Sequence, residues 1–288
     1  MTASTISRRD FLRLAGISLI AVQVPLPILS AIHKPMYARA FNAVPVHSAP
    51  TLASALVRHL WPNSVLEIEA IESGWYRLVD GFVPIESLQP MHPYIPDVAD
   101  PVLEIGMPVT VSGPAAAVRQ WCAADAPLVT HIGHGATAYV ADYLPDKYSG
   151  WYAISDADHN VLGWTQSIFW SSVTELEIPA QSHKVMVNRQ TNEISVYTAD
   201  RLSIQSVCSV GDLVATGDYP LTGRQFATRQ GSRYGVPYSL YADGLSLYGV
   251  YWHNRFGTSH PGLSIELPIL TAATIYSMLD EKSHILVV

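Results

Sequence analysis

A repeated Gly-Trp-Tyr pattern is the feature that most restricts how this chain can fold. The stretch SGWYRLVDGFVPIESLQP begins at Ser73, and SGWYAISDADHNVLGWTQS begins at Ser149. In both copies Gly-Trp-Tyr is followed by an alternating apolar run, a turn with Asp, Asn or Gly, and a second short run. Period-two alternation on both sides of such a turn predicts a β-hairpin. The chain is therefore expected to hold two small, strongly bent β modules.

The first forty residues have the pattern of an export signal. Arg8 and Arg9 precede an apolar run that opens at Ala15, as in a twin-arginine leader. A glutamine and two prolines interrupt this run, which makes it a poor membrane span. Ala38 and Ala40 have the A-x-A spacing of a cleavage site, so a signal peptide over residues 1–40 is expected. An uncleaved N-terminal anchor is the alternative.

The rest of the chain is acidic. Without residues 1–40 it has 12 basic and 23 acidic residues, a formal net charge of −11. Nucleic-acid binding by counterion release needs clustered Lys and Arg, which this sequence lacks, so no nucleic-acid partner is expected. With 49% hydrophobic and 14% charged residues the chain is expected to fold. Cys122 and Cys208 are expected as buried free thiols rather than as a bridge.

The two repeats resemble the bacterial SH3-like domain. The resemblance rests on Trp75, Tyr76 and Gly81-Phe82-Val83 in the first copy and on Trp151, Tyr152, Gly163 and Trp164 in the second. It implies two small barrels, at residues 41–95 and 96–180, of a kind that accompanies bacterial cell-wall enzymes. The three tryptophans are expected in the cores, because burial of large aromatic rings stabilises so small a barrel. The proline-rich stretch at residues 90–101 predicts the linker between the copies.

From His183 onward the sequence predicts a third domain, at residues 181–288. Short alternating runs separated by turns at Thr191-Asn192 and Ala199-Asp200 predict a β-meander. Near the end, the apolar spacing in LPILTAATIYSML predicts one amphipathic helix that begins near Thr271. The expected fold class is mainly β, with two SH3-like barrels followed by a β-sheet domain with one packed helix.

This third domain resembles the catalytic domain of the L,D-transpeptidases, which cross-link peptidoglycan stem peptides with a cysteine nucleophile. The most specific element is GVYWHNRFG, from Gly249 to Gly257, which is similar to a Gly-Thr-Tyr-Trp-His-Asn-Asn-Phe-Gly run in one subgroup. GDYPLTGRQFATRQ resembles the family's Thr-Pro-x-Gly stretch, with Tyr219 in place of the Thr. The resemblance covers about residues 183–288 and implies an L,D-transpeptidase-type β-sandwich.

Other residue types occupy the two catalytic positions of that family. Members have His between an aliphatic residue and Gly as the general base, where this chain has Leu247-Tyr248-Gly249. Members have Ser-His-Gly-Cys at the nucleophile, where this chain has Pro261-Gly262-Leu263-Ser264. The resemblance therefore implies that Tyr248 replaces the base and Ser264 the nucleophile. Leu263 in place of Gly is expected to disfavour the positive-φ bend that aims backbone N–H groups at an oxyanion.

This replacement is unfavourable for acyl transfer. A serine hydroxyl reacts only when a base takes its proton, and tyrosine, with an ordinary pKa of about 10, is a poor base at pH 7. His253 and His260 are the candidates for a surrogate base. The candidate substrate-binding residues are Trp252, Asn254, Gly262 and Glu266.

Three functions remain open at this point. The first is a cell-envelope protein, inactive or weakly active, that binds peptidoglycan or its stem peptides in a groove. The second is an active acyltransferase that uses Ser264, and the third is a non-enzymatic scaffold whose SH3-like modules bind the wall. No cofactor is implied, and His131 and His134 lack the nearby Cys, Asp or Glu of a metal site. The expected location is the cell envelope or the exterior, with no transmembrane span in the mature chain.

Overall fold

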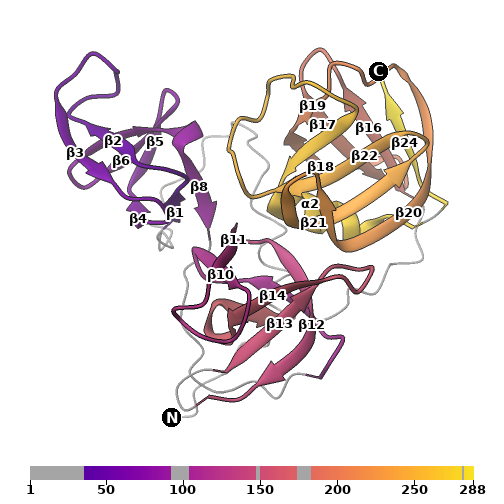
Figure 1. The fold of residues 1–288 in the computed structure, drawn as a ribbon. Helices are drawn as coiled ribbons and strands as arrows, with labels where there is room; N and C mark the ends of the chain where they lie inside the picture. Colours follow the sequence, from indigo (N-terminus) through magenta and orange to yellow (C-terminus); the bar gives the residue numbers. More distant parts are fainter. Residues whose placement is uncertain (1–35, 92–103, 147–149, 174–182, 281) are drawn as a thin grey trace, which may run out of the picture. The chain divides into compact units, whose positions relative to one another are not determined.

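A computed structural model describes residues 36–91, 104–146, 150–173, 183–280 and 282–288 (Figure 1). The expected leader up to residue 35 and most of the expected linker lie outside these residues. As expected, the described chain is mainly β, with one α-helix. That helix has ten residues, and the described part of the chain contains no helix long and apolar enough to cross a bilayer. The described residues belong to one compact unit.

Module 1, residues 36–91, contains two antiparallel sheets, ordered β4-β1-β8 and β3-β2-β7-β6-β5. Its elements are β1 (Met36–Ala40), β2 (Val44–His47), β3 (Leu56–Leu60), β4 (Val65–Ile68), β5 (Ala70–Glu72), β6 (Trp75–Leu78), β7 (Gly81–Pro84), the 3-10 turn η1 (Ile85–Ser87) and β8 (Leu88–Met91). Strands β6 and β7 pair directly across a two-residue connection. The first predicted hairpin is therefore confirmed.

Strand β1 lies within the stretch that the sequence assigns to the signal peptide. It is the central strand of its sheet, between β4 and β8. Ala38 and Ala40 are fully buried in the module's hydrophobic core, and Arg39 is 5% exposed. Cleavage after Ala40 would remove this strand and expose both of its neighbours, so the A-x-A pattern coincides here with a structural strand.

Module 2, residues 104–173, forms one seven-stranded sheet ordered β11-β10-β14-β13-β12-β9-β15. Its elements are β9 (Pro108–Val111), β10 (Ala115–Arg119), β11 (Leu128–Gly133), β12 (Thr137–Leu144), β13 (Trp151–Ser155), β14 (Val161–Gln166), the 3-10 turn η2 (Ser167–Phe169) and β15 (Trp170–Ser172). Strands β13 and β14 are antiparallel neighbours, which confirms the second hairpin. The barrel character of both modules remains a prediction.

The tyrosines of the two Gly-Trp-Tyr copies are the core residues. Tyr76 is 3% exposed and Tyr152 is fully buried, whereas Trp75 and Trp164 are only half-buried. Alternation along β6 turns Tyr76 and Leu78 inward, so the neighbouring Trp75 lies on the other face. The prediction that three tryptophans fill the cores is right for Trp151 alone.

The C-terminal domain, residues 183–288, forms a sheet ordered β18-β17-β16-β24-β20-β21-β22-β23-β19. Its elements are β16 (His183–Asn188), β17 (Glu193–Thr198), β18 (Arg201–Val207), β19 (Ser209–Val210), β20 (Gly217–Gln230), β21 (Arg233–Ala242), β22 (Leu245–Val250), β23 (Ser264–Pro268), α2 (Ile269–Met278) and β24 (His284–Val287). Strands β16, β17 and β18 pair in sequence order, which confirms the predicted meander.

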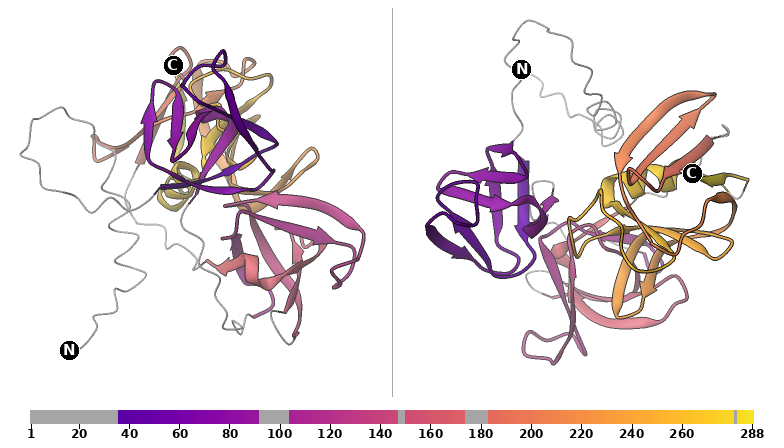
Figure 2. Two further views of the ribbon diagram at one scale, coloured as in Figure 1. Left: turned by 90° about the vertical axis from the view of Figure 1, so that its left-hand side faces the viewer. Right: turned by 90° about the horizontal axis from the view of Figure 1, so that it is seen from above.

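Strand β20 divides this sheet into two parts that share one core. Its first residues, up to Pro220, pair with β24, and from Leu221 onward it pairs with β21. One hydrophobic cluster joins residues from both parts with Ala272 and Ile275 of α2. In both views of Figure 2 the yellow helix lies alongside strands of its own domain. The helix begins at Ile269, two residues before the predicted start.

The two cysteines are free thiols. Cys208 is fully buried, and burial raises the pKa of its thiol to about 12. Cys122 is only half-buried, contrary to the prediction of two buried thiols.

Candidate functional site

The site begins with the pairing of two parallel strands, β22 and β23. Their register places Ser246 beside Ser264 and Tyr248 beside Glu266. Because side chains alternate along a strand, these four residues share one face of the sheet. The residues between them, Leu247 and Ile265, are fully buried in the core on the other face. The register thus gathers four polar side chains over an apolar layer.

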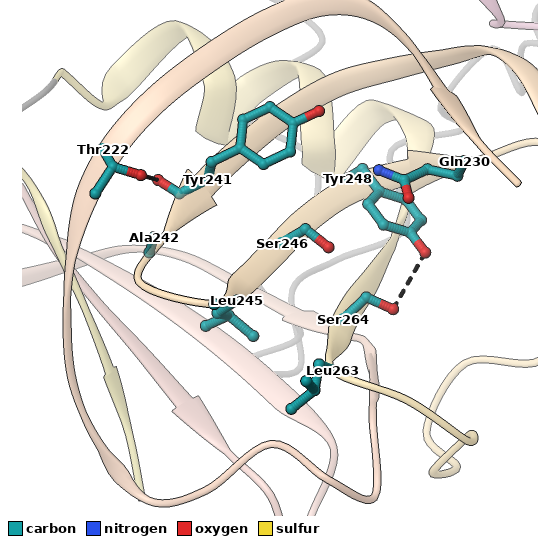
Figure 3. A pocket seen from close by; sticks show the side chains of 10 residues that line it. Thr222, Gln230, Tyr241, Ala242, Leu245, Ser246, Tyr248, Leu263 and Ser264 are labelled. Atoms are coloured by element: carbon teal, nitrogen blue, oxygen red, sulfur yellow. Dashed lines mark hydrogen bonds between the residues drawn. The ribbon is translucent and has the colours of Figure 1, made fainter.

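Ser264 and Tyr248 are hydrogen-bonded to each other. The phenol of Tyr248 donates to Ser264 Oγ at 3.1 Å (Figure 3). The same phenol oxygen lies 3.5 Å from Glu266 Oε1. Burial is the main factor that raises the pKa of Tyr248, and the negative charge of Glu266 adds to the rise. Tyr248 therefore keeps its proton at neutral pH and is a donor toward Ser264.

Glu266 is a buried carboxylate that accepts from an imidazole. Its side chain is 11% exposed, and its Oε2 lies 2.8 Å from His253 Nε2. The other ring nitrogen of His253, Nδ1, accepts the backbone N–H of Arg255 at 3.1 Å. A neutral imidazole has one donor and one acceptor nitrogen, so this arrangement places the proton on Nε2. His253 is thereby directed at Glu266.

His260 does not reach the serine hydroxyl either. Its Nδ1 lies 3.0 Å from the carbonyl oxygen of Pro261, and its Nε2 lies 3.1 Å from the backbone carbonyl oxygen of Ser264. The same Nε2 is 4.0 Å from Glu266 Oε2. Across the residues that the structure describes, no imidazole nitrogen is hydrogen-bonded to Ser264 Oγ.

The loop before Ser264 is tied to the segment that follows β19. The backbone N–H of Gly262 donates to Asp212 Oδ1 at 2.9 Å, and Gly211 donates its N–H to the carbonyl oxygen of Ser264 at 2.8 Å. Gly262 has a φ of +123°, whereas Leu263 is absent from the positive-φ residues of the described chain. The left-handed bend therefore falls at Gly262, one residue before Leu263, and Asp212 accepts the N–H of that glycine.

A groove of about 370 Å³ opens beside the Ser264–Tyr248 pair. Its polar lining consists of uncharged side chains from β20, β21, β22 and β23, namely Thr222, Gln230, Tyr241, Ser246, Tyr248 and Ser264. Leu245 and Leu263 add apolar surface (Figure 3). Such a mixture of hydroxyl, amide and apolar groups offers both hydrogen-bonding and apolar contacts to a ligand.

Sequence reasoning found only part of this lining. The position of Ser246 was predictable from the sequence, because it lies two residues before Tyr248 and strand alternation puts both side chains on one face. Thr222, Gln230 and Tyr241 come from a separate hairpin, β20–β21, and nothing in their local sequence marks them.

The remaining candidate residues lie outside the groove lining. Trp252 packs its ring 6.2 Å from that of Tyr248, beneath the guanidinium of Arg233. Asn254 donates its side-chain amide to the carbonyl oxygen of Ile85, in module 1, at 3.1 Å. Within the described residues, no group of three or more His, Cys, Asp or Glu side chains is arranged to hold a metal ion.

No protein-family model matches this chain, and no curated protein matches it. Among solved structures it is similar to the catalytic domain of an E. faecium L,D-transpeptidase, at 14% identity and a TM-score of 0.34, over 37% of this chain and 97% of that one. It is also similar to an L,D-transpeptidase from Mycobacterium tuberculosis, at 12% identity and a TM-score of 0.35, over 67% of this chain and 95% of that one.

A further similar structure is a fused Zn-dependent amidase/peptidase/peptidoglycan-binding domain-containing protein from Clostridium acetobutylicum. The identity is 15% and the TM-score 0.29, over 37% of this chain and 52% of that one, so the chain spans about half of that protein's length. Similarities of this size assign no role to any residue of this chain.

Proposed function

We propose that the chain is an exported cell-envelope protein of the L,D-transpeptidase type that binds peptidoglycan stem peptides without transferring acyl groups. The observation that carries the proposal is the partner of Ser264, a protonated phenol that donates to its hydroxyl. Acyl transfer requires the opposite arrangement, a group that accepts the serine proton. His253 is committed to Glu266, and His260 faces backbone carbonyls.

The loop geometry supports the same conclusion. An oxyanion is stabilised by preorganised hydrogen-bond donors, and one N–H of this loop, that of Gly262, is already bonded to Asp212. The groove itself remains open and offers uncharged donors and acceptors along with two leucines. An extended peptide, with its alternating amide groups and small side chains, matches that lining.

The catalytic part of the proposal is tested with a carbapenem, an acylating agent for cysteine L,D-transpeptidases, and intact-mass measurement. The wild-type chain is expected to form no adduct. The positive control restores the family pattern with Tyr248→His, Gly262→His, Leu263→Gly and Ser264→Cys together, and an adduct on this variant shows that the reagent reaches the site. A wild-type adduct that disappears in Ser264→Ala would instead establish an active serine acyltransferase.

The binding part is tested by retention of the full chain on purified peptidoglycan. Ser246→Trp fills the groove and is expected to abolish most of the retention. Ser171→Trp is the matched control, because Ser171 is an exposed serine on β15 of module 2. Equal retention of both variants would show that the binding surface lies outside the groove, as the scaffold hypothesis requires.

A further inference from the structure

The segment that carries His253, residues 251–255, begins in the hydrophobic cluster of module 2, where Tyr251 is buried and Trp252 packs. The segment is also held from two other sides. On one side His253 bonds to Glu266 of the C-terminal domain. On the other side three contacts reach this segment from module 1, more than 160 residues earlier in the chain. These contacts involve the residues before and after His253 and leave the imidazole free to face Glu266.

The first contact comes from Arg39 on β1. Its guanidinium donates to the carbonyl oxygen of Tyr251, to Gln89 Oε1 and to Asn63 Oδ1, with nitrogen–oxygen distances between 2.5 and 2.8 Å. All three acceptors are neutral oxygens, although Arg39 is only 5% exposed. Burial lowers the pKa of its guanidinium to about 10. Among the described residues no carboxylate pairs with Arg39, and a buried cation without such a partner is costly, so its bonds to these oxygens are needed to keep it in place.

The second and third contacts come from η1, and Tyr76 of β6 lies beside the second. The Asn254 amide donates to the carbonyl oxygen of Ile85 and lies 3.4 Å from the hydroxyl of Tyr76. Arg255 pairs with Glu86 at 3.7 Å, on an exposed surface where such a pair contributes little. Asn254 is thus the second strong link, and it belongs to the motif that carries the family resemblance.

We propose that module 1 is a clamp on the candidate site, in which Arg39 and Asn254 are positioning residues that hold residues 251–255 so that His253 engages Glu266. Module 1 is then a structural part of the C-terminal site and not an independently tethered wall-binding unit. This role does not depend on the proposed ligand, because it concerns the unliganded chain. Removal of β1 would take Arg39, and with it the first contact, away from residues 251–255.

The test uses the full chain and hydrogen–deuterium exchange measured by mass spectrometry. Arg39→Met and Asn254→Ala are expected to speed exchange in residues 251–255 about tenfold, the factor expected when a net hydrogen-bond free energy of about 1.4 kcal/mol is lost. Arg58→Met is the matched control. Arg58 is also an arginine of module 1, but its partner is Asp80 within the same module. The control is expected to leave residues 251–255 unchanged.

The 15N chemical shifts of the His253 imidazole are a second measurement, and loosening elsewhere in the chain would not change them. In the wild type its two ring nitrogens are expected to have the well-separated 15N shifts of a fixed Nε2–H tautomer. In Asn254→Ala these shifts are expected to move toward each other as the ring loses its fixed partners.

Asn254→Ala decides the outcome, because this substitution changes no residue of module 1. Unchanged exchange in residues 251–255 together with unchanged His253 shifts would overturn the proposal. If Arg39→Met unfolds module 1, the clamp predicts fast exchange in the same segment. A protected segment beside an unfolded module 1 would overturn it equally.

Discussion

Replacement of Tyr248 by phenylalanine tests the hydrogen bond on which the proposed function depends. The ring packs in a small buried cluster with Val236 and Val250, and phenylalanine keeps that packing. What is lost is one hydroxyl, which donates to Ser264 Oγ at 3.1 Å and lies near Glu266 Oε1. A neutral hydrogen bond contributes about 0.5–1.5 kcal/mol net, and one to a charged group somewhat more. We therefore expect Tyr248→Phe to lower the free energy of unfolding by about 1–2 kcal/mol.

The same variant is expected to differ from the wild type in its pH dependence. Burial raises the pKa of Tyr248 in the folded state, whereas in the unfolded chain the phenol ionises near pH 10. Above that pH the unfolded state releases the proton first, so stability that is fully present below about pH 10 is lost as pH rises toward the folded pKa. Phenylalanine cannot ionise, and the stability gap between variant and wild type should narrow above pH 10.

Urea denaturation at pH 7 and at pH 10.5 measures both effects. Tyr219→Phe is the control, since the Tyr219 hydroxyl donates to the carbonyl oxygen of Ala215 on an exposed surface. Its effect should stay within about 0.5 kcal/mol. A Tyr248→Phe variant as stable as the wild type at pH 7 would refute the view that this phenol is a bound donor, and with it the assignment of Ser264 as unreactive.

Three further predictions concern stability. Glu266→Leu should lower the free energy of unfolding by about 1–3 kcal/mol, because it leaves the Nε2–H of His253 without its acceptor. Glu266→Gln should lower that free energy by less, and equal effects of the two variants in urea denaturation would contradict the prediction. Because burial raises the pKa of the Cys208 thiol to about 12, wild-type stability should fall as pH rises from about 9 toward 12, and Cys208→Ala should flatten that fall in the same titration. A chain that begins at residue 41 should lose the dispersed NMR signals of module 1 that a chain beginning at residue 36 retains; a folded module 1 without β1 would disprove the central place of that strand.

Local patterns predicted the hairpins, the meander and the helix. In the hairpins and the meander, paired strands are also neighbours in sequence, so alternation and turn residues specify the pairing. The same reasoning misplaced the core aromatics. It recognised Gly-Trp-Tyr but had no means of telling which of two adjacent rings faces inward, since one residue of shift along a strand reverses every side chain.

The expected cleavage site after Ala40 shows a second way in which a sequence pattern is ambiguous. Ala38 and Ala40 fit both a cleavage site and a strand packed on both sides, because each context selects small apolar residues. Only the pairing of β1 with β4 and β8 separates the two interpretations.

The sequence by itself determined which groups are available: a hydroxyl at Ser264 and a phenol at Tyr248, with no thiol and no imidazole at either position. The tertiary structure alone decided how these groups are used. The parallel register of β22 and β23 brings Tyr248, Ser264 and Glu266 onto one face. Arg39 and module 1 direct the segment that carries His253. Both arrangements join residues far apart in sequence, and their hydrogen bonds exist only when the whole fold brings donor and acceptor together, so no local pattern encodes them.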